Sequence, residues 1–167
     1  MKVDRYLDSA GNLLSAKIFS ETLSKKFNAY YTFQESGSFA SDNDPEINGK
    51  PILMGSLKTN IFANDSEKLA FLAGTYVRYG LFNDTAYLIN IGNSLSKAAI
   101  CYQLLKELNC KPSYEILKDN TPTIYDVYFH PNKKVESYLQ RFMFLRKRLD
   151  DGEKLFIKKM MSRSRRK

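Results

Sequence analysis

The chain has 167 residues, 43% of them hydrophobic, which is enough to bury the core of one globular domain or of two small ones. No apolar run approaches the roughly eighteen residues that a membrane span needs, so we expect no membrane partner, and Met1–Arg5 leads into no secretory signal. The net charge is +8, but residues 133–167 hold 13 Lys and Arg against 4 Asp and Glu, so the basic character lies at the C-terminal end.

The first third of the chain predicts a helix, two strands and a polar loop. Residues 13–27 predict the helix, because apolar side chains recur there at helical spacing. Residues 29–34 and 51–57 are typical of short strands. Between these strands, residues 35–50 are polar and acidic and are interrupted by Gly and Pro, which predicts a loop.

A second helix is predicted from Ser66 to Gly80. Asp65 or Ser66 can cap its first turn, and apolar residues three and four apart form one face. Ala73 and Gly74 lie within that face and would let a second backbone come close. Gly80 predicts a left-handed end to the helix.

The elements after this helix predict an α+β fold of αββαββα type. Residues 1–65 precede that region, and a basic helix and tail, residues 150–167, follow a break at Asp150-Asp151-Gly152. The predicted elements are a hairpin over 81–91 with a turn at Asn83-Asp84, a helix over 97–108, strands over 111–117 and 123–129, and a helix over 133–149.

The second helix resembles the signature helix of the LAGLIDADG homing endonucleases and their maturase relatives. Leu72, Ala73, Gly74 and Gly80 match that nine-residue motif, and the order of elements over residues 66–149 is the order of a LAGLIDADG repeat. The resemblance implies a saddle-shaped sheet. It also implies that Ala73, Gly74 and Gly80 pack two such helices side by side.

The motif departs from the family at its acidic positions. In the family, the acidic residue before the closing glycine holds a divalent metal over the DNA. Here that position is Tyr79, and the other acidic position is Val77. Neither side chain can hold Mg²⁺, which prefers carboxylates and water. We therefore expect no catalytic residue, no metal and no cofactor, and an active homing endonuclease that uses Asp84 is the minority alternative.

An internal echo links the two halves of the chain. Setting each residue against the residue 81 positions later pairs Leu14 with Leu95 and Ser15 with Ser96. One explanation is that residues 1–65 are a degenerate first half-repeat that has lost its signature helix and hairpin. The other explanation is chance agreement between two amphipathic helices. Both stay open.

The predicted sheet offers a polar and aromatic surface for nucleic acid. Tyrosines on a sheet can stack on unpaired bases. The alternative is ordinary core packing, because successive side chains of a strand point to opposite faces. The residues expected to contact bases are Tyr87, Asn90, Tyr114, Tyr125 and Tyr128.

The C-terminal helix and tail offer contacts to phosphates. Such contacts release counterions and give an affinity that depends on salt but not on sequence. The alternatives are a solvated basic helix and an amphipathic helix on an anionic membrane surface. The expected contacts are Arg141, Arg146, Lys147, Arg148, Lys158, Lys159, Arg163, Arg165, Arg166 and Lys167. The first four are expected off the buried stripe of their helix.

Cysteine and histidine usage narrows the remaining classes. Cys101 and Cys110 predict buried thiols in an intracellular, reducing compartment. A triad enzyme or a zinc site would have to recruit the single histidine, His130. No glycine-rich phosphate loop with a Lys-Ser/Thr ending is present.

Together these features predict a catalytically inactive nucleic-acid-binding protein. RNA is favoured over DNA, because family members that lose cleavage are similar to intron maturases. A subunit of a ribonucleoprotein such as an organellar ribosome fits equally well, and the Asn-, Lys- and Tyr-rich composition favours an AT-rich genome such as that of a mitochondrion. A homodimer stays open. The alternative is a protein–protein interaction subunit whose basic tail pairs with an acidic partner.

Overall fold

The computed structural model describes residues 2–7, 11, 13–35, 53–82 and 86–164. The chain is an α+β protein that divides into two compact units, Met1–Lys58 (unit 1) and Thr59–Lys167 (unit 2). None of the helices in the described ranges is long and apolar enough to cross a membrane.

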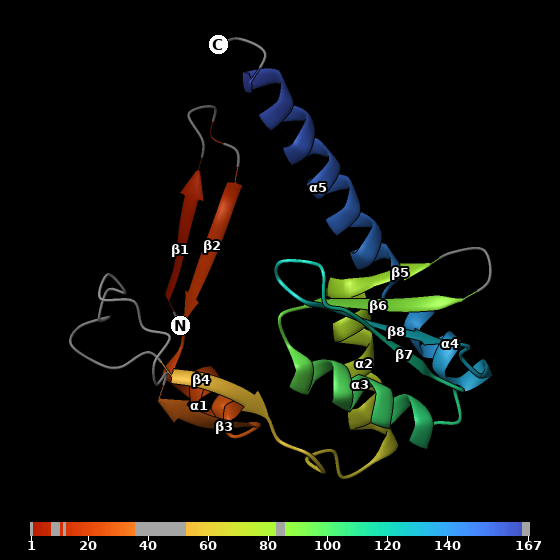
Figure 1. The fold of residues 1–167 in the computed structure, drawn as a ribbon. Helices are drawn as coiled ribbons and strands as arrows, with labels where there is room; N and C mark the ends of the chain where they lie inside the picture. The colour runs from red at the N-terminus through yellow and green to blue at the C-terminus, as the bar shows by residue number, and fades with distance from the viewer. Residues whose placement is uncertain (1, 8–10, 12, 36–52, 83–85, 165–167) are drawn as a thin grey trace. The chain divides into compact units, whose positions relative to one another are not determined.

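The described part of unit 1 contains two separate antiparallel strand pairs and one helix (Figure 1). The helix begins after Ser20, whose hydroxyl oxygen accepts a hydrogen bond from the backbone N–H of Leu23 at 3.3 Å. The elements are β1 (Lys2–Leu7), β2 (Leu13–Phe19), α1 (Glu21–Asn28), β3 (Tyr31–Glu35) and β4 (Leu53–Leu57).

The prediction of a helix over residues 13–27 is wrong for the first half of that segment. Residues 13–19 form β2 and pair antiparallel with β1, so the hairpin that the half-repeat explanation takes to be lost is present. Leu14 and Ser15 therefore lie in a strand, whereas their echo partners Leu95 and Ser96 lie in a helix. The apolar spacing of a short segment fits both structures, and the pairing with a distant strand decides between them.

Unit 2 has the predicted order of elements, including a last helix at its C-terminal end. Its strands form a single antiparallel sheet in the order β5-β6-β8-β7 (Figure 1). The elements are α2 (Asp65–Tyr79), β5 (Gly80–Phe82), β6 (Tyr87–Gly92), α3 (Leu95–Glu107), β7 (Ser113–Leu117), β8 (Ile124–Phe129), α4 (Lys133–Gln140) and α5 (Met143–Ser164).

Helix α2 begins and ends differently from the prediction. Asn64 is its N-cap, and a reciprocal capping pair forms: the Asn64 side chain accepts from the N–H of Glu67 at 3.0 Å, while the Glu67 carboxylate accepts from the N–H of Ala63 at 2.8 Å. Gly80 is extended, with φ −74° and ψ 141°, and is not left-handed. Glycine is needed there for close approach, because a Cβ would meet the backbone oxygen of Tyr76 and lie 2.6 Å from its ring.

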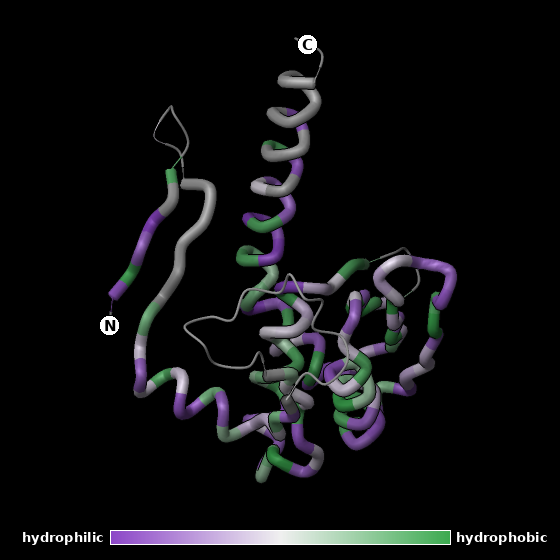
Figure 2. The backbone as a smooth tube through the Cα atoms, turned by 60° about the vertical axis from the view of Figure 1, so that its left-hand side comes forward, coloured by the Kyte–Doolittle hydropathy of each residue, from purple (hydrophilic) through white to green (hydrophobic). Residues whose placement is uncertain are grey.

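The C-terminal helices are divided at another point than expected. Helix α4 ends at Gln140, and α5 then runs without a break from Met143 through Gly152, where the sequence predicted an end. A glycine inside a helix costs only about 1 kcal/mol relative to alanine, so a helix of 22 residues can contain one. Hydrophilic and hydrophobic residues alternate along the first turns of α5 (Figure 2).

The core of unit 2 lies between the sheet and helices α2 and α3. Ile91 and Val127 contribute from the strands, and Leu72 and Leu105 from the helices, and all four are almost fully buried. Cys101 and Cys110 are buried free thiols, as predicted. Burial raises the pKa of the Cys101 thiol to about 12, so this thiol stays protonated and unreactive at neutral pH.

Candidate nucleic-acid interface

The two faces of the unit 2 sheet differ in what they contact. Strand register places Ile89 opposite Val127 and Ile91 opposite Tyr125, so these side chains share one face. Helices α2 and α3 pack against that face. The side chains of Asn90 and the residues on its face point away from these helices. The strands therefore have a helix-covered face and an open face.

Three of the five sheet residues expected to contact bases lie on the helix-covered face. The ring of Tyr87 lies 5.5 Å from those of Tyr76 and Phe129. Its hydroxyl donates to the Glu136 carboxylate at 3.4 Å and accepts from the Gln140 amide at 3.5 Å. Burial raises the pKa of Tyr87. This side chain packs between α2 and α4 and is not available for base stacking.

Tyr114 and Tyr125 also turn toward the helices. The Tyr114 ring stacks on Tyr125, with centroids 6.3 Å apart, and meets Tyr102 of α3 edge-on at 6.1 Å. Among the residues that the structure describes, the buried Tyr114 hydroxyl finds no hydrogen-bond partner, and burial raises its pKa. For these two residues and for Tyr87, core packing is the correct interpretation of the sequence pattern.

Asn90 and Tyr128 lie on the open face, where Asp126 holds them. Asn90 and Asp126 are cross-strand partners, and the Asn90 amide donates to the Asp126 carboxylate at 2.6 Å. The Tyr128 hydroxyl donates to the other oxygen of that carboxylate at 3.5 Å. Desolvation, and then the negative charges of Asp126 and Glu115, raise the pKa of Tyr128. Asp126 is only 5% exposed and orients both neighbours.

Strands β5 to β8 carry negative charge and no positive charge. Their charged residues are Glu115 and Asp126, which lie opposite each other on the open face. A phosphate backbone placed directly on these strands would meet two carboxylates and no cation. Carboxylates can instead accept hydrogen bonds from base amino groups. The sequence pattern does contain this signal, because Asp126 alternates with core residues and stands two positions before Tyr128.

Of the small residues of α2, Gly74 does not pack a second helix within the described chain. Ala73 is buried against the core of unit 2, whereas Gly74 is exposed, and a Cβ added to it would have no atom within 4 Å. At the end of the helix, the ring of Tyr79 lies under the ammonium of Lys97, 5.5 Å away. Among the residues that the structure describes, no three His, Cys, Asp or Glu side chains come together as a metal site.

Arg146 is buried, although it was expected off the buried stripe as a phosphate contact. Its guanidinium donates to the backbone oxygens of Val77 at 3.1 Å and Arg78 at 2.9 Å, and it forms an ion pair with Asp150. The residue is only 8% exposed, so its guanidinium cannot reach a phosphate. Apolar spacing misses this role, because the partner oxygens belong to the backbone of a helix almost seventy residues earlier.

The other expected cations of α4 and α5 differ in how far the structure describes them. Lys147, Arg148 and Lys158 are exposed on α5, as is Lys154, which the sequence analysis missed. Arg141 is exposed and lies over the ring of Tyr138 at 5.5 Å. Lys159 and Arg163 lie in α5, but their side chains are outside the described set, as are all of Arg165, Arg166 and Lys167.

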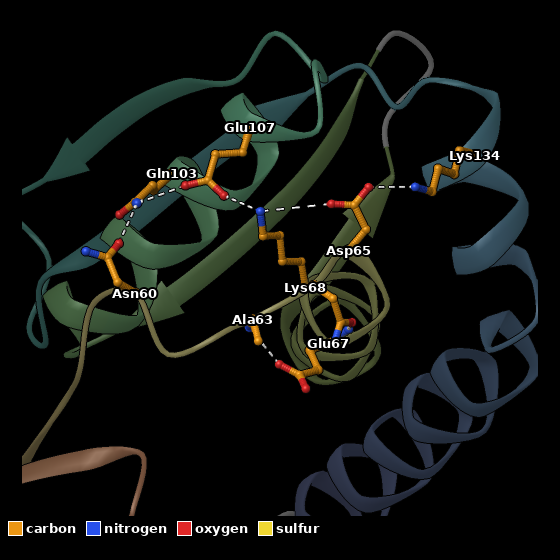
Figure 3. A network of polar contacts seen from close by, with 9 residues as sticks. Asn60, Ala63, Asp65, Glu67, Lys68, Gln103, Glu107 and Lys134 are labelled. Carbon is orange, nitrogen blue, oxygen red and sulfur yellow. Dashed lines mark hydrogen bonds and ion pairs between the residues drawn. The ribbon is translucent and has the colours of Figure 1, made fainter.

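A polar network binds α2 to α3 and α4 on another side of unit 2 (Figure 3). Lys134 pairs with Asp65 at 2.7 Å, and Lys68 pairs with Glu107 at 2.7 Å. Hydrogen bonding and charge from these partners lower the pKa of Asp65 and of Glu107 and raise that of Lys68. A cavity of about 220 Å³ opens beside Lys68 and Gln103. Because Lys68 and Lys134 are already paired, they do not extend the cationic surface of α5.

Comparisons of this chain with protein-family models, with curated proteins and with solved structures gave no match. What unit 2 does must therefore follow from its own geometry and charges.

Proposed function

We propose that this chain is a non-catalytic nucleic-acid-binding protein whose helix α5 holds the phosphate backbone. The observation that carries the proposal is the separation of charge within unit 2. Lys147, Arg148, Lys154 and Lys158 are exposed along α5, whereas strands β5 to β8 hold carboxylates and no cation. A concentrated basic surface on one element is the pattern that attracts a polyanion.

The order of elements supports the same proposal. Unit 2 follows the αββαββα order with one antiparallel sheet, as the resemblance to a LAGLIDADG repeat implies. The open face would then contact bases through Asn90 and Tyr128, while α5 contacts the backbone. Val77 and Tyr79 supply no carboxylate at the end of α2, which favours binding without cleavage.

RNA is the favoured ligand in this proposal. The open face offers polar groups and an aromatic side chain, which suit unpaired bases better than they suit the phosphates of a duplex. The protein would act in a maturase-like role or within a ribonucleoprotein such as an organellar ribosome. The exposed position of Gly74 supports a homodimer in which two α2 helices meet.

Binding at increasing salt tests the proposal. Fluorescence anisotropy would follow labelled single-stranded RNA, single-stranded DNA and duplex DNA. The matched variants are Lys154→Gln/Lys158→Gln on α5 and Lys106→Gln/Lys118→Gln elsewhere on unit 2, which remove the same charge from exposed positions. We expect the α5 pair to lower the slope of log K against log salt by about 1.4 for the single-stranded ligands, because each lost phosphate contact lowers it by roughly 0.7.

Two results would contradict the proposal. One is no binding to any of the three ligands, and the other is an equal loss of slope in both double variants. Mg²⁺-dependent nicking of plasmid DNA that Asp84→Asn abolishes would replace it with an active nuclease. Proteins that stay bound to the chain after nuclease treatment would favour an interaction subunit with an acidic partner.

A further inference from the structure

Arg146, in the first turn of α5, contacts the C-terminal end of α2. The guanidinium donates to two successive backbone oxygens, those of Val77 and Arg78, and its side chain is 10% exposed. The Asp150 carboxylate, one helical turn further along α5, pairs with the same guanidinium. We call these two side chains, with the two oxygens they hold, the clasp.

The physics of helix ends explains why a cation sits there. The last carbonyl groups of a helix lack intrahelical donors and carry partial negative charge. The chain passes directly from α2 into β5 at Gly80. The backbone N–H of Gly80 donates to the backbone oxygen of Tyr76. The oxygens of Val77 and Arg78 therefore take their donor from another element, and Arg146 is that donor.

The clasp is placed where it can set the direction of α5. Helix α5 packs chiefly against α2, and in both views it then runs away from the body of unit 2 (Figures 1 and 2). Beyond the clasp, Asp151, Gly152, Lys154, Leu155 and Lys158 are exposed. The far part of α5 is thus held at one end.

We infer that Arg146 and Asp150 are positioning residues that fix the direction in which α5 leaves unit 2. Arg146 itself contacts no ligand. The part of this inference that concerns nucleic acid rests on the proposed function. Lys147, Lys154 and Lys158 are seven and four residues apart, so they share one side of the helix. The clasp holds that row of cations in a fixed orientation relative to the open face of the sheet.

Loss of the clasp has a different signature from loss of a phosphate contact. Without the clasp the cations remain, so the number of phosphates neutralised and the salt slope stay the same. The affinity falls because binding to the variant must order α5, which the clasp already orders in the parent chain. A residue that touches phosphate would instead lower both the affinity and the slope.

Distance measurement between spin labels tests the clasp without any ligand. Labels at residues 106 and 158 sit on exposed positions of α3 and α5, and the two native cysteines are buried and out of reach of the reagent. We expect a narrow distance distribution in the parent chain and a broad one in Arg146→Gln. Arg148→Gln is the matched control, because it removes the same charge from an exposed position two residues away, and it should leave the distribution narrow.

The same variants in the binding assay complete the test. Arg146→Gln should weaken binding about tenfold with an unchanged salt slope, whereas Arg148→Gln should lower the slope. Arg146→Lys keeps the charge but loses the planar fork, so it should broaden the distance distribution in part. Asp150→Asn should also broaden the distance distribution in part. If Arg146→Gln does not fold, Arg146→Lys and Asp150→Asn replace it in both measurements.

Each failure has its own meaning. A distribution that stays narrow in Arg146→Gln, Arg146→Lys and Asp150→Asn would overturn the clasp. A lower salt slope in Arg146→Gln would overturn the claim that Arg146 touches no ligand. If the parent chain binds no nucleic acid, the proposed function fails, while the distance distributions still decide on the clasp.

Discussion

Units 1 and 2 share an order of elements but differ in how much of their described part is buried. Each contains two strands, a helix and two strands in that order, and unit 2 adds α2 before them and α4 and α5 after them. In unit 2 the strands join one four-stranded sheet, and Ile89, Ile91 and Val127 on its helix-covered face are almost fully buried. In the described part of unit 1 the hairpins stay separate, and large side chains such as Phe27 and Leu7 are 64% and 55% exposed.

The difference shows what a covering helix contributes. A sheet needs a second layer to bury its apolar face, and an isolated two-stranded hairpin is at best marginally stable. Helix α2 supplies that layer in unit 2, with Leu72 and Tyr76 almost fully buried against the strands. Stability should therefore be concentrated in unit 2, and the predictions below compare matched changes in the two units.

Removing a core side chain from unit 2 should have the largest effect. Ile91 of β6 is 0% exposed, so Ile91→Ala loses buried area and leaves a cavity, at a cost of about 3 kcal/mol in the free energy of unfolding. Denaturant unfolding followed by circular dichroism measures this loss. A cost below about 1 kcal/mol would mean that the sheet of unit 2 is not the centre of stability.

Alkaline pH should weaken unit 2 through a buried tyrosine. Burial raises the pKa of Tyr76 from its ordinary 10.0 to about 12. The unfolded chain therefore loses this proton near pH 10 while the folded chain keeps it, so stability is complete below pH 10 and falls as the pH rises toward 12. The fall amounts to up to about 3 kcal/mol. Unfolding between pH 9 and 12 should show a shallower fall in Tyr76→Phe, and an identical fall would assign the effect to other groups.

Sequence reasoning was most successful where local pattern and tertiary structure agree. The element order of unit 2 was predicted correctly because α2 and α3 have long apolar faces and the strands between them are bounded by turns. The prediction from sequence failed at residues 13–19, because their strand structure depends on pairing with β1 and not on local apolar spacing. It also failed at Gly152, because a glycine weakens a long helix without ending it.

The candidate interface was predicted less well, for a geometric reason. A strand pattern reveals alternation but not which of its two faces the helices cover, so it predicts the same role for Tyr87, Tyr114 and Tyr125 as for Asn90 and Tyr128. The register between β6 and β8 separates them. Arg146 could not be placed from sequence, because its partners are backbone oxygens of Val77 and Arg78, which carry no side-chain signature.

Helix caps should show the same contrast between the units at a smaller scale. The Asn132 side chain caps α4 by accepting from the N–H of Val135 at 3.0 Å, and it also donates to the backbone oxygen of Leu108 at 2.7 Å. Asn132→Ala should cost about 1–2 kcal/mol. Ser20→Ala removes the cap of α1 in unit 1, whose helix has no buried residue, and it should have less than half that effect on thermal unfolding.

The smallest effect is expected from an aromatic residue of unit 1. Phe33 of β3 is 40% exposed, and its ring lies 6.2 Å from that of Tyr31. Phe33→Ala should therefore change the free energy of unfolding by less than about 1 kcal/mol, because much of this ring stays in water and its removal leaves no enclosed cavity. Hydrogen exchange at the amides of residues 31–35 measures the change within unit 1 itself. A loss as large as that of Ile91→Ala would mean that unit 1 buries this ring in solution against a surface that its own hairpins do not provide.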